Sequence, residues 1–442
     1  MLGLESLGIE WASLLLILTI FGLLLIGLPL AFVTGLTAMI FAFGWFNPMV
    51  ATHLVTSRVY GFLNEYVLVA IPMFVLMASL LDRSGIARDL YNTMRLFAGR
   101  LPGGVAVQTL VVALFLAAMS GIIGGEIVLL GLLALPQMLR MGYDKKLAIG
   151  TVCAGGSLGT MVPPSIVLII YGLTANQSIN DLFLATIIPA FLLGSLYITY
   201  ILVKCRLDPS LGPPLSAEEL EIPLSEKLRS AKSVILPVLV AAMVLGSIYA
   251  GIASVTEAAS MGVVGVLLST WLRKELNWKM MYQSLRQTLN TVGMIIWIGL
   301  GANALVGAYN LMGGNRFVEG AILGLDVAPI VIILVMMFIM LILGLFMDWI
   351  GIALLAMPIF VPIVIKLGYD PIWFGILFSM NMQVSYLSPP FGPAAFYLKS
   401  VAPPDISLGL IYRSMLPFIA LQIVALMLVL FFPQIALWLP GL

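Results

Sequence analysis

The stretch GGSLGTMVPPS occupies residues 155–165, and a related stretch, SYLSPPFG, occupies residues 385–392. A Gly-Tyr-Asp triplet precedes each of them, at 142–144 and at 368–370, and the spacing from the triplet to the paired prolines is identical. A single Pro-Pro pair in an apolar segment usually marks only a kink in a helix. Two such stretches with the same triplet at the same spacing indicate an internal repeat.

Further matches extend the repeat beyond the prolines. Pro136 and Tyr171 recur as Pro362 and Tyr397, in the register that aligns the two triplets. In a membrane protein, a repeat of this kind is typical of secondary transporters.

The composition is that of a membrane protein. Of the 442 residues, 62% are hydrophobic and only 9% are charged. Apolar stretches such as 11–46, 182–203 and 408–432 exceed the roughly 20 residues that a transmembrane helix needs. The net charge of +1 argues against nucleic acid as a partner. The two cysteines, Cys153 and Cys205, do not suggest a disulfide framework.

Before the first copy of the repeat, the sequence predicts three spans and a surface helix. The spans are expected at 11–27, 29–46 and 65–81. Residues 47–64 are expected to form a polar connection, with His53 as a loop residue. Residues 84–100 place apolar and charged side chains on opposite helical faces, which predicts a helix lying in the membrane surface.

Residues 101–139 are apolar apart from Glu126, but small and polar residues interrupt them at 120–126. Seven basic residues flank this segment: Arg83, Arg88, Arg95, Arg100, Arg140, Lys145 and Lys146. By the positive-inside rule, both ends are cytoplasmic. The segment is therefore predicted to be a re-entrant hairpin with its tip at 120–126.

The remaining elements follow the same logic. After the hairpin we expect a span at 147–175 that is broken at 155–164, a span at 182–203, and a polar connection at 204–232 between the two halves. In the second half we expect spans at 234–252, 255–272 and 291–312, a surface helix at 275–289, a hairpin at 327–365 with its tip at 344–351, a broken span at 371–399 and a last span at 408–432.

Only Arg316 and Lys366 flank the second hairpin, against seven basic residues around the first. This difference places its ends on the opposite face of the membrane. The predicted fold class is an all-α polytopic membrane protein with inverted repeats, two re-entrant hairpins and two broken helices. Both termini are then expected on the outer side.

Breaking a helix inside a membrane is costly, because hydrocarbon offers no partner to an unpaired amide or carbonyl. Pro163 and Pro164 remove two donors and free carbonyls one turn earlier. Freed carbonyls can coordinate a small hard cation, and half-helix N-termini can face an anion. The pattern therefore favours two cation sites flanking one substrate site. The alternative is that the breaks are hinges without a ligand.

Acidic residues in apolar surroundings usually face a cavity or a partner. Glu126 and Asp348 lie at the two predicted tips, where we expect them to contact substrate or the closing interface. Glu257 either faces a cavity or caps a helix near the interface. Asp144 and Asp370 are expected to be helix N-caps.

At these residues the chain resembles the large membrane subunit (M subunit) of tripartite ATP-independent periplasmic (TRAP) transporters, over nearly its whole length. The motifs that carry the resemblance are Met119-Ser120-Gly121, Leu135-Pro136-Gln137-Met138, Gly142-Tyr143-Asp144, Gly155-Gly156-Ser157-Leu158-Gly159, Pro163-Pro164-Ser165, Thr256-Glu257-Ala258-Ala259 and Ser388-Pro389-Pro390-Phe391-Gly392.

The resemblance implies an elevator-type transporter of the bacterial or archaeal cytoplasmic (inner) membrane, driven by a sodium gradient rather than ATP. It implies two partners: a small four-helix membrane subunit and a periplasmic substrate-binding protein. It implies no organic cofactor, two sodium sites and a small organic acid as substrate.

Carried over by motif, the resemblance also assigns site residues. One sodium site would use Ser120, Gly159, Val162 and Pro164, and the other would use Gly344, Ser385, Ser388 and Phe391, mostly through backbone carbonyls. Substrate would contact Gly124, Gly125, Glu126, Ser165, Asp348, Pro390 and Gly392. At the first tip, residues 122–126 depart from the run of Ser, Thr and Ala that many members have.

The resemblance implies a scaffold and a mobile transport domain. The scaffold is expected at 1–100 and 182–323, the transport domain at 101–181 and 324–405, and a final span at 406–442. One rival is a self-sufficient carrier or antiporter, coupled to sodium or protons, on the same plan. A rival of another class is an intramembrane aspartyl protease using Asp144 and Asp370, but these residues lie at loop ends. Nothing in the sequence resembles a channel's selectivity filter.

Overall fold

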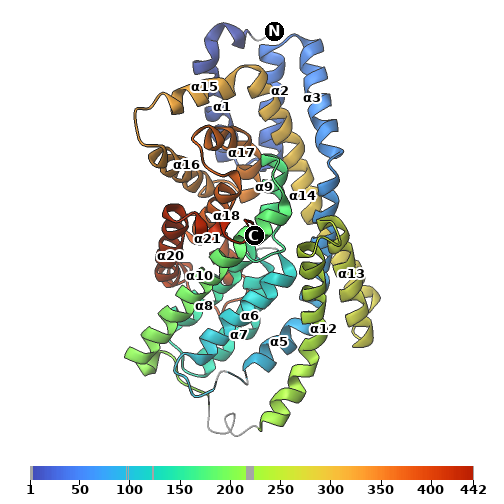
Figure 1. Ribbon diagram of the computed structural model, residues 1–442, viewed down its shortest axis with the longest axis vertical. Helices are drawn as coiled ribbons and strands as arrows, with labels where there is room; N and C mark the ends of the chain where they lie inside the picture. The colour runs from blue at the N-terminus through green and yellow to red at the C-terminus, as the bar shows by residue number, and fades with distance from the viewer. Residues whose placement is uncertain (1–2, 96, 98, 122–123, 216–222, 442) are drawn as a thin grey trace.

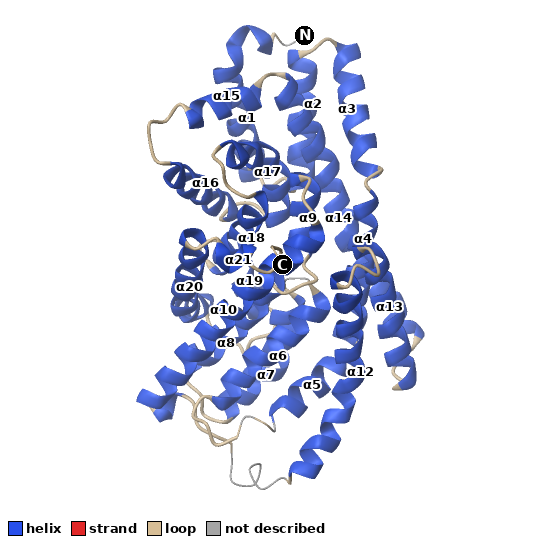
Figure 2. Ribbon diagram, in the orientation of Figure 1, coloured by secondary structure: helices blue, strands red, loops and turns tan. Residues whose placement is uncertain are grey.

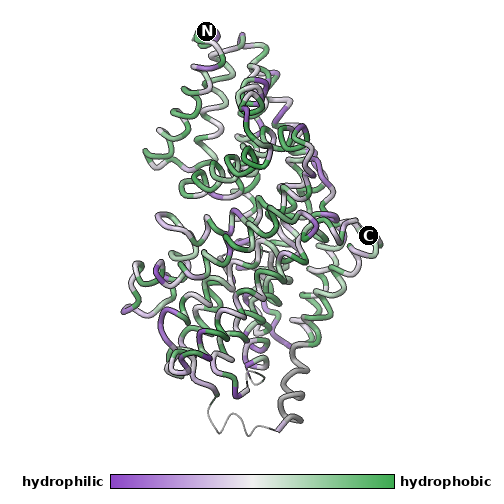
Figure 3. Tube along the Cα trace, turned by 60° about the vertical axis from the view of Figure 1, so that its left-hand side comes forward, coloured by the Kyte–Doolittle hydropathy of each residue, from purple (hydrophilic) through white to green (hydrophobic). Residues whose placement is uncertain are grey.

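The computed structural model describes residues 3–95, 97, 99–121, 124–215 and 223–441, and all regular secondary structure within these ranges is helical (Figures 1 and 2). Hydrophobic residues predominate along most of the trace (Figure 3). Among the described helices, 7 are long and apolar enough to cross a membrane. Large apolar side chains such as Leu25 and Trp278 are exposed, as lipid-facing residues are. The predicted all-α, multi-pass class is confirmed.

Two helical hairpins stand in equivalent places of the two halves. The first consists of α6 (Gly104–Ser120) and α7 (Gly125–Arg140), and the second of α16 (Pro329–Gly344) and α17 (Trp349–Lys366). The first hairpin lies in the lower part of the molecule and the second in the upper part (Figure 1). α6 and α16 have 17 and 16 residues, too few to cross a bilayer comfortably. Both tips fall within the predicted segments.

A broken helix follows each hairpin. The first pair is α8 (Lys145–Ser157) and α9 (Ile166–Ala175), with a short 3-10 turn, η3 (Leu158–Thr160), between them. The second pair is α18 (Pro371–Leu387) and α19 (Pro393–Lys399). In each repeat the peptide bond between the paired prolines is cis.

The first break begins later than 155, because Gly155 and Gly156 remain helical. A Cβ added to Gly155 would lie 3.0 Å from Ala113 Cβ, and one on Gly156 would collide with Ile127. These glycines allow α8 to approach α6 and α7 closely, rather than interrupting the helix.

Capping explains where several helices begin. Asp144 Oδ1 accepts from the Leu147 amide at 2.9 Å, and Asp370 Oδ1 accepts from the Ile372 amide at 2.7 Å. The expected N-cap role of both aspartates is confirmed. Glu257 forms a capping box with Ser254, whose amide donates to Glu257 Oε2 at 2.7 Å, and this decides the question left open for Glu257.

Two long helices pack onto the hairpins and the broken helices. α10 (Ile179–Leu207) contacts α6, α9, α18 and α20 (Leu408–Phe431), while α20 contacts α8 and α18. Short helical segments, η4 (Pro209–Leu211) and α21 (Gln434–Leu437), follow them.

A separate group of helices forms the remainder of the molecule. Its members are η1 (Leu4–Leu7), α1 (Gly8–Leu25), α2 (Leu30–Trp45), α3 (Pro48–Leu63), η2 (Tyr66–Val69), α4 (Ala70–Arg83), α5 (Ile86–Arg95), α12 (Leu224–Tyr249), α13 (Val255–Leu272), α14 (Trp278–Leu311) and α15 (Gly314–Leu323). In this group α14 packs against α2, α3 and α4, and α13 packs against α4 and α12. We call α1 to α5 and α12 to α15 the frame.

Two sequence predictions in the frame are wrong. Residues 47–64 are not a loop, and His53 lies within α3, which Asn47 caps by accepting from the Val50 amide at 2.9 Å. An Asn followed by Pro is a strong helix-start signal, since Asn caps and Pro fits the first turn. Residues 275–289 are not a separate surface helix, because α14 runs uninterrupted through 34 residues.

The other boundaries differ by less. The connection at 204–232 is shorter than expected, because α10 continues to Leu207 and α12 begins at Leu224; residues 216–222 lie outside the described part. The first surface helix, α5, is confirmed as a helix, and its Asp89 pairs with Arg273. α15, which the sequence did not indicate, is joined to the second hairpin by a Glu319–Lys366 ion pair.

Candidate functional site between the two hairpin tips

The second tip meets the second broken helix. A Cβ on Gly344 would lie 2.5 Å from Ser385 Oγ, so α16 and α18 approach closely at this point. A cavity of about 20 Å³ lies beside them, and Asp348 and Tyr386 also line it. About 10–15 Å³ suffices for one water-sized particle. This cavity contains two of the predicted sodium ligands, Gly344 and Ser385.

Asp348 has a structural role in addition to any binding role. Its Oδ1 accepts from the Trp349 amide at 2.9 Å and so caps α17. The carboxylate is thereby held at the N-terminus of the second arm of the hairpin, where the helix dipole favours negative charge.

The first tip meets the first broken helix in the same manner. Gly121 has φ +59° and contacts the Pro164 carbonyl, which leaves no room for a side chain. Glu126, in the first turn of α7, is buried, and a Cβ on Gly159 would lie 2.9 Å from its Oε1. The side chain of Ser120 and residues 122–123 lie outside the described part, so Ser120 cannot be compared with its predicted role.

Three further residues, which the sequence reading missed, gather at the tips. Asp82 of α4 lies against the start of α7, where a Cβ on Gly125 would be 2.8 Å from its Oδ2. The Tyr397 ring covers Gly124 at 2.9 Å from an added Cβ, and it stacks on Tyr386 with 6.4 Å between ring centroids.

Tyr386 also lines the small cavity together with Asp348, so the stacked Tyr386–Tyr397 pair extends from the second tip to Gly124 of the first. The signals for these residues were present in the sequence. Asp82 is an acid at the end of an apolar span, and Tyr397 is the repeat partner of Tyr171.

Side chains satisfy several carbonyls freed by the first break. The Thr160 carbonyl accepts from Ser165 Oγ at 2.6 Å and from Ser379 Oγ at 3.0 Å. The Met161 carbonyl accepts from Thr186 Oγ1 at 2.7 Å, and the Ser157 carbonyl accepts from Gln383 Nε2 at 3.0 Å. The predicted ligands are neighbouring carbonyls. That of Gly159 lies between Ser157 and Thr160 in the sequence, and those of Val162 and Pro164 follow Met161. Ser165, a predicted substrate contact, is fully buried within the break itself.

The second break is held from α20. Tyr412 Oη donates to the carbonyls of Pro390 at 2.9 Å and Phe391 at 3.1 Å. Gly392, with φ +29°, lies close to the Ser388 carbonyl, and Ser388 Oγ donates to the Val384 carbonyl at 2.6 Å. A carbonyl oxygen has two lone pairs, so Phe391 keeps one for a further partner.

The breaks are also joined at the membrane surface. Lys145, at the start of α8, donates to Asp405 at 2.6 Å, just beyond α19. This hydrogen bond holds the pKa of the exposed Asp405 carboxyl below its ordinary value.

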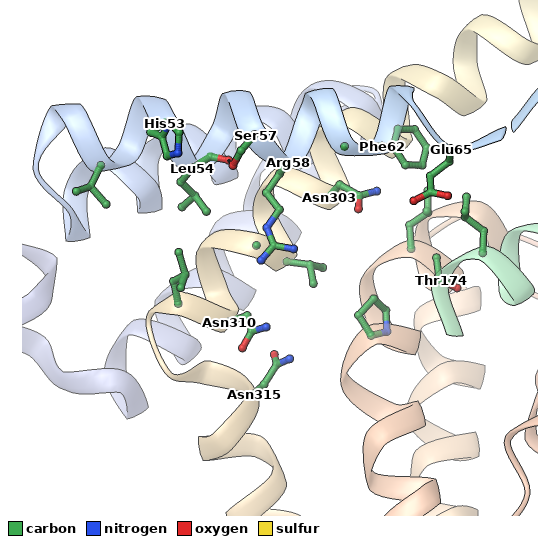
Figure 4. Close-up of a pocket in the computed structure, with 18 of the residues that line it drawn as sticks. His53, Leu54, Ser57, Arg58, Phe62, Glu65, Thr174, Asn303, Asn310 and Asn315 are labelled. Carbon is green, nitrogen blue, oxygen red and sulfur yellow. Dashed lines mark hydrogen bonds between the residues drawn. The ribbon is translucent and has the colours of Figure 1, made fainter. Parts of the chain in front are cut away.

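A cleft with several polar side chains in its lining lies elsewhere. It has a volume of about 940 Å³ and lies between α3 and α14 on one side and α9 and α17 on the other (Figure 4). His53, Arg58, Glu65, Asn303, Asn310 and Asn315 line it. None of the predicted site residues does.

Two inverted hairpins whose tips touch paired broken helices define a membrane transport protein rather than an enzyme. Comparison with known proteins gives the family. Residues 17–435 match the family described as "Tripartite ATP-independent periplasmic transporter, DctM component". The chain belongs to this family and is the large permease subunit of a TRAP transporter.

Similar proteins carry names of the same family. The C4-dicarboxylate TRAP transporter large permease protein DctM of Vibrio cholerae is 28% identical, over 97% of each chain. The sialic acid TRAP transporter large permease protein SiaM of the same organism is also 28% identical, over 95% of this chain and 96% of its own length. A crystal structure of the Alcanivorax borkumensis YdaH transporter, described as having an unusual topology, shares the fold at a TM-score of 0.59 and 16% identity, covering 85% of this chain and 86% of that one.

The contact at the first tip gives a testable pair of variants. Gly121→Ala and Gly313→Ala both place a side chain at positive φ, but a Cβ at Gly313 meets no atom within 4 Å. Each substitution is expected to lower the free energy of unfolding by about 1 kcal/mol through backbone strain. In Gly121→Ala, the new methyl group also displaces the hairpin tip from the Pro164 carbonyl. We expect a larger fall in melting temperature in detergent for Gly121→Ala, together with loss of transport. Equal melting temperatures and full transport in both would contradict the tip contact.

Proposed function

We propose that the chain is the membrane permease of a sodium-gradient-driven importer of small organic acids in the bacterial or archaeal cytoplasmic membrane. It works with a small four-helix membrane subunit and a periplasmic binding protein. The observation that carries the proposal is the cavity beside Gly344 and Ser385. Its lining includes the oxygen-bearing side chains of Asp348, Ser385 and Tyr386 beside apolar ones, its volume suits one small particle, and it lies where a hairpin tip meets a broken helix.

The proposed sodium ligands at the second site are Gly344, Ser385, Ser388 and Phe391, of which Gly344 and Ser385 line this cavity. At the first site they are Ser120, Gly159, Val162 and Pro164. Sodium supplies positive charge between the acidic tips. Substrate binds between those tips, near Gly124, Gly125, Glu126, Ser165, Asp348, Pro390 and Gly392.

The organic-acid class comes from the relatives. Their names specify C4-dicarboxylates, sialic acid, ectoine or 5-hydroxyectoine, and isethionate. Each of these compounds carries a carboxylate except isethionate, which carries a sulfonate. The name of the family describes a tripartite system, which supports the two partners.

We further propose an elevator movement, in which the hairpins and broken helices slide against the frame. We place α10 and α20 in this moving unit, because α10 contacts the first hairpin and the broken helices of both repeats, and α20 contacts the broken helices of both repeats. This assignment changes the boundaries expected from the sequence, where the span at 182–203 was placed in the scaffold.

The first experiment is uptake into proteoliposomes that contain this chain and its small membrane partner. An inward sodium gradient is supplied without ATP, with and without the cognate binding protein loaded with succinate, sialic acid or ectoine. We expect uptake to require both sodium and the binding protein. Uptake with sodium alone would identify a self-sufficient carrier. A response to protons but not to sodium would overturn the cation sites.

A side-chain variant tests the second cation site. Ser385→Ala removes a hydroxyl that lines the small cavity, and loss of one ligand of several is expected to raise the sodium concentration for half-maximal uptake about tenfold, equivalent to about 1.4 kcal/mol. Uptake at saturating sodium should persist. Ser414→Ala is the matched control, because Ser414 is buried, donates to the Leu410 carbonyl at 2.7 Å, and does not line the cavity. An equal sodium dependence in both variants would place the site elsewhere.

Cross-linking tests the elevator movement. Leu30 of the frame touches Gly351 of the second hairpin, so a Leu30→Cys, Gly351→Cys pair would tie the frame to the moving unit. Gly131 and Leu398 also touch, but both belong to the moving unit, so Gly131→Cys, Leu398→Cys is the control. The native cysteines are both buried. We expect cross-linking to abolish uptake only in the first pair, reversibly on reduction. Retained uptake there would exclude sliding between these elements.

A further inference from the structure

The cleft of about 940 Å³ is separate from the hairpin tips and has its own chemistry. One wall is made by α3 and α14 of the frame, and the other by the end of α9 and the middle of α17 (Figure 4). Its volume falls within the range of small-molecule sites, about 300–1,000 Å³.

Arg58 is the cation of this cleft. Its side chain extends from α3 toward α14 (Figure 4), where a Cβ on Gly307 would lie 2.7 Å from Arg58 Cγ. Glycine at 307 therefore leaves the space that the arginine stem occupies. Arg58 takes part in none of the ion pairs among the described residues, which use other basic residues. Glu65, the acidic residue of the lining, lies toward the other end of the cleft (Figure 4).

Three asparagines line the same cleft as the guanidinium (Figure 4). Asn303 and Asn310 are seven residues apart on α14, which places them on one helical face with Gly307 between them. Asn315 follows at the start of α15, and its Oδ1 has no hydrogen-bond partner within the described residues. A guanidinium binds a carboxylate through two parallel hydrogen bonds, and primary amides can serve the other polar groups of a small acid.

The cleft lies on the side away from the first hairpin. α3 is at the top of the molecule, while the first hairpin and α5 are at the bottom (Figure 1), and seven basic residues flank that hairpin against two around the second. By the positive-inside rule, the bottom faces the cytoplasm and the cleft faces outward.

We propose that this cleft is an outer binding site for the carboxylate of the organic acid, with Arg58 as its anion-binding group, occupied before the acid reaches the tips. The ligand's identity and the direction of movement rest on the proposed function. The anion site itself rests on the geometry of the cleft. Because the two walls belong to the frame and to the moving unit, sliding reshapes the site, which allows it to hold the acid in one state and release it in another.

Charge-selective labelling of the cleft tests the proposal without any transport. Ser57 is exposed, lines the cleft next to Arg58, and can be replaced by its near-isostere in Ser57→Cys. In the purified complex, this variant is reacted with an anionic sulfonate-bearing methanethiosulfonate and with a cationic, trimethylammonium-bearing one. Because Arg58 attracts anions, we expect the ratio of anionic to cationic rates to fall about tenfold when Arg58→Gln is added. Arg286→Gln, an exposed arginine on the cytoplasmic part of α14, is the control and should leave the ratio unchanged.

Protection by succinate then tests carboxylate binding. Millimolar succinate should slow labelling of Ser57→Cys at least threefold, and this protection should disappear with Arg58→Gln. Arg58→Lys should keep the charge preference but lose most of the protection, because lysine cannot form the paired hydrogen bonds. A rate ratio insensitive to Arg58→Gln would overturn the proposal. So would protection by the binding protein but not by succinate, which would make the cleft a protein-docking surface.

The labelling results and the uptake results are independent of each other. If uptake proves to need no sodium or no binding protein, Arg58-dependent protection by succinate still establishes the site. If uptake behaves as proposed but succinate gives no protection, the cleft is not the outer site.

Discussion

The pairing of backbone groups inside hydrocarbon is the constraint on which the rest of this structure depends. Each repeat interrupts a helix within the membrane, and each interruption frees carbonyls that lipid cannot satisfy. The chain meets this requirement by crossing between repeats. Ser379 and Gln383, from the second broken helix, donate to the Thr160 and Ser157 carbonyls of the first. Away from the breaks, Tyr171 of the first repeat donates to the Pro371 carbonyl at the start of α18, at 2.5 Å.

These hydrogen bonds join the two inverted halves. The first break is partly satisfied by the second broken helix, so separating the two broken helices would leave the Thr160 and Ser157 carbonyls without these donors. Tyr412 extends the unit to α20 by donating to the second break, and Thr186 extends it to α10 by donating to the first. These hydrogen bonds support, as the packing does, the proposal that α10 and α20 belong to the moving unit.

The sequence predicted the features that leave a regular signal. The paired prolines, the Gly-Tyr-Asp triplets and the interrupted apolar runs were enough for both hairpins, both broken helices and the capping role of Asp144 and Asp370. The sequence-based prediction failed where the average polarity of a segment was given more weight than the residues that start or stop a helix. Residues 47–64 are polar enough to suggest a loop, yet Asn47 and Pro48 begin a helix there. Likewise, amphipathicity at 275–289 suggested a surface helix separate from the span at 291–312. α14 instead continues through residue 290, where the two were expected to be separated.

The candidate site could be predicted only in part, for a physical reason. Ligands that act through backbone carbonyls are specified by where a helix breaks, which glycine and proline reveal. Contacts between distant elements are not encoded locally, so the approach of Asp82 to Gly125, and of Tyr397 to Gly124, requires the tertiary structure. Arg58 was equally hidden, because its importance comes from Gly307 and the asparagines of α14, some 250 positions along the chain.

The distribution of charge gives these parts a common logic. Asp82, Glu126 and Asp348 gather at the tips, whereas the outer cleft has Arg58 as its cation. Two like charges 4 Å apart repel by about 4 kcal/mol at a protein surface, so an organic acid is poorly received by the tips alone and well received by the cleft. Under the proposed function, sodium bound beside the tips reverses this preference. Movement of the acid from cleft to tips would then require the cation, which is the thermodynamic condition for coupling the two fluxes.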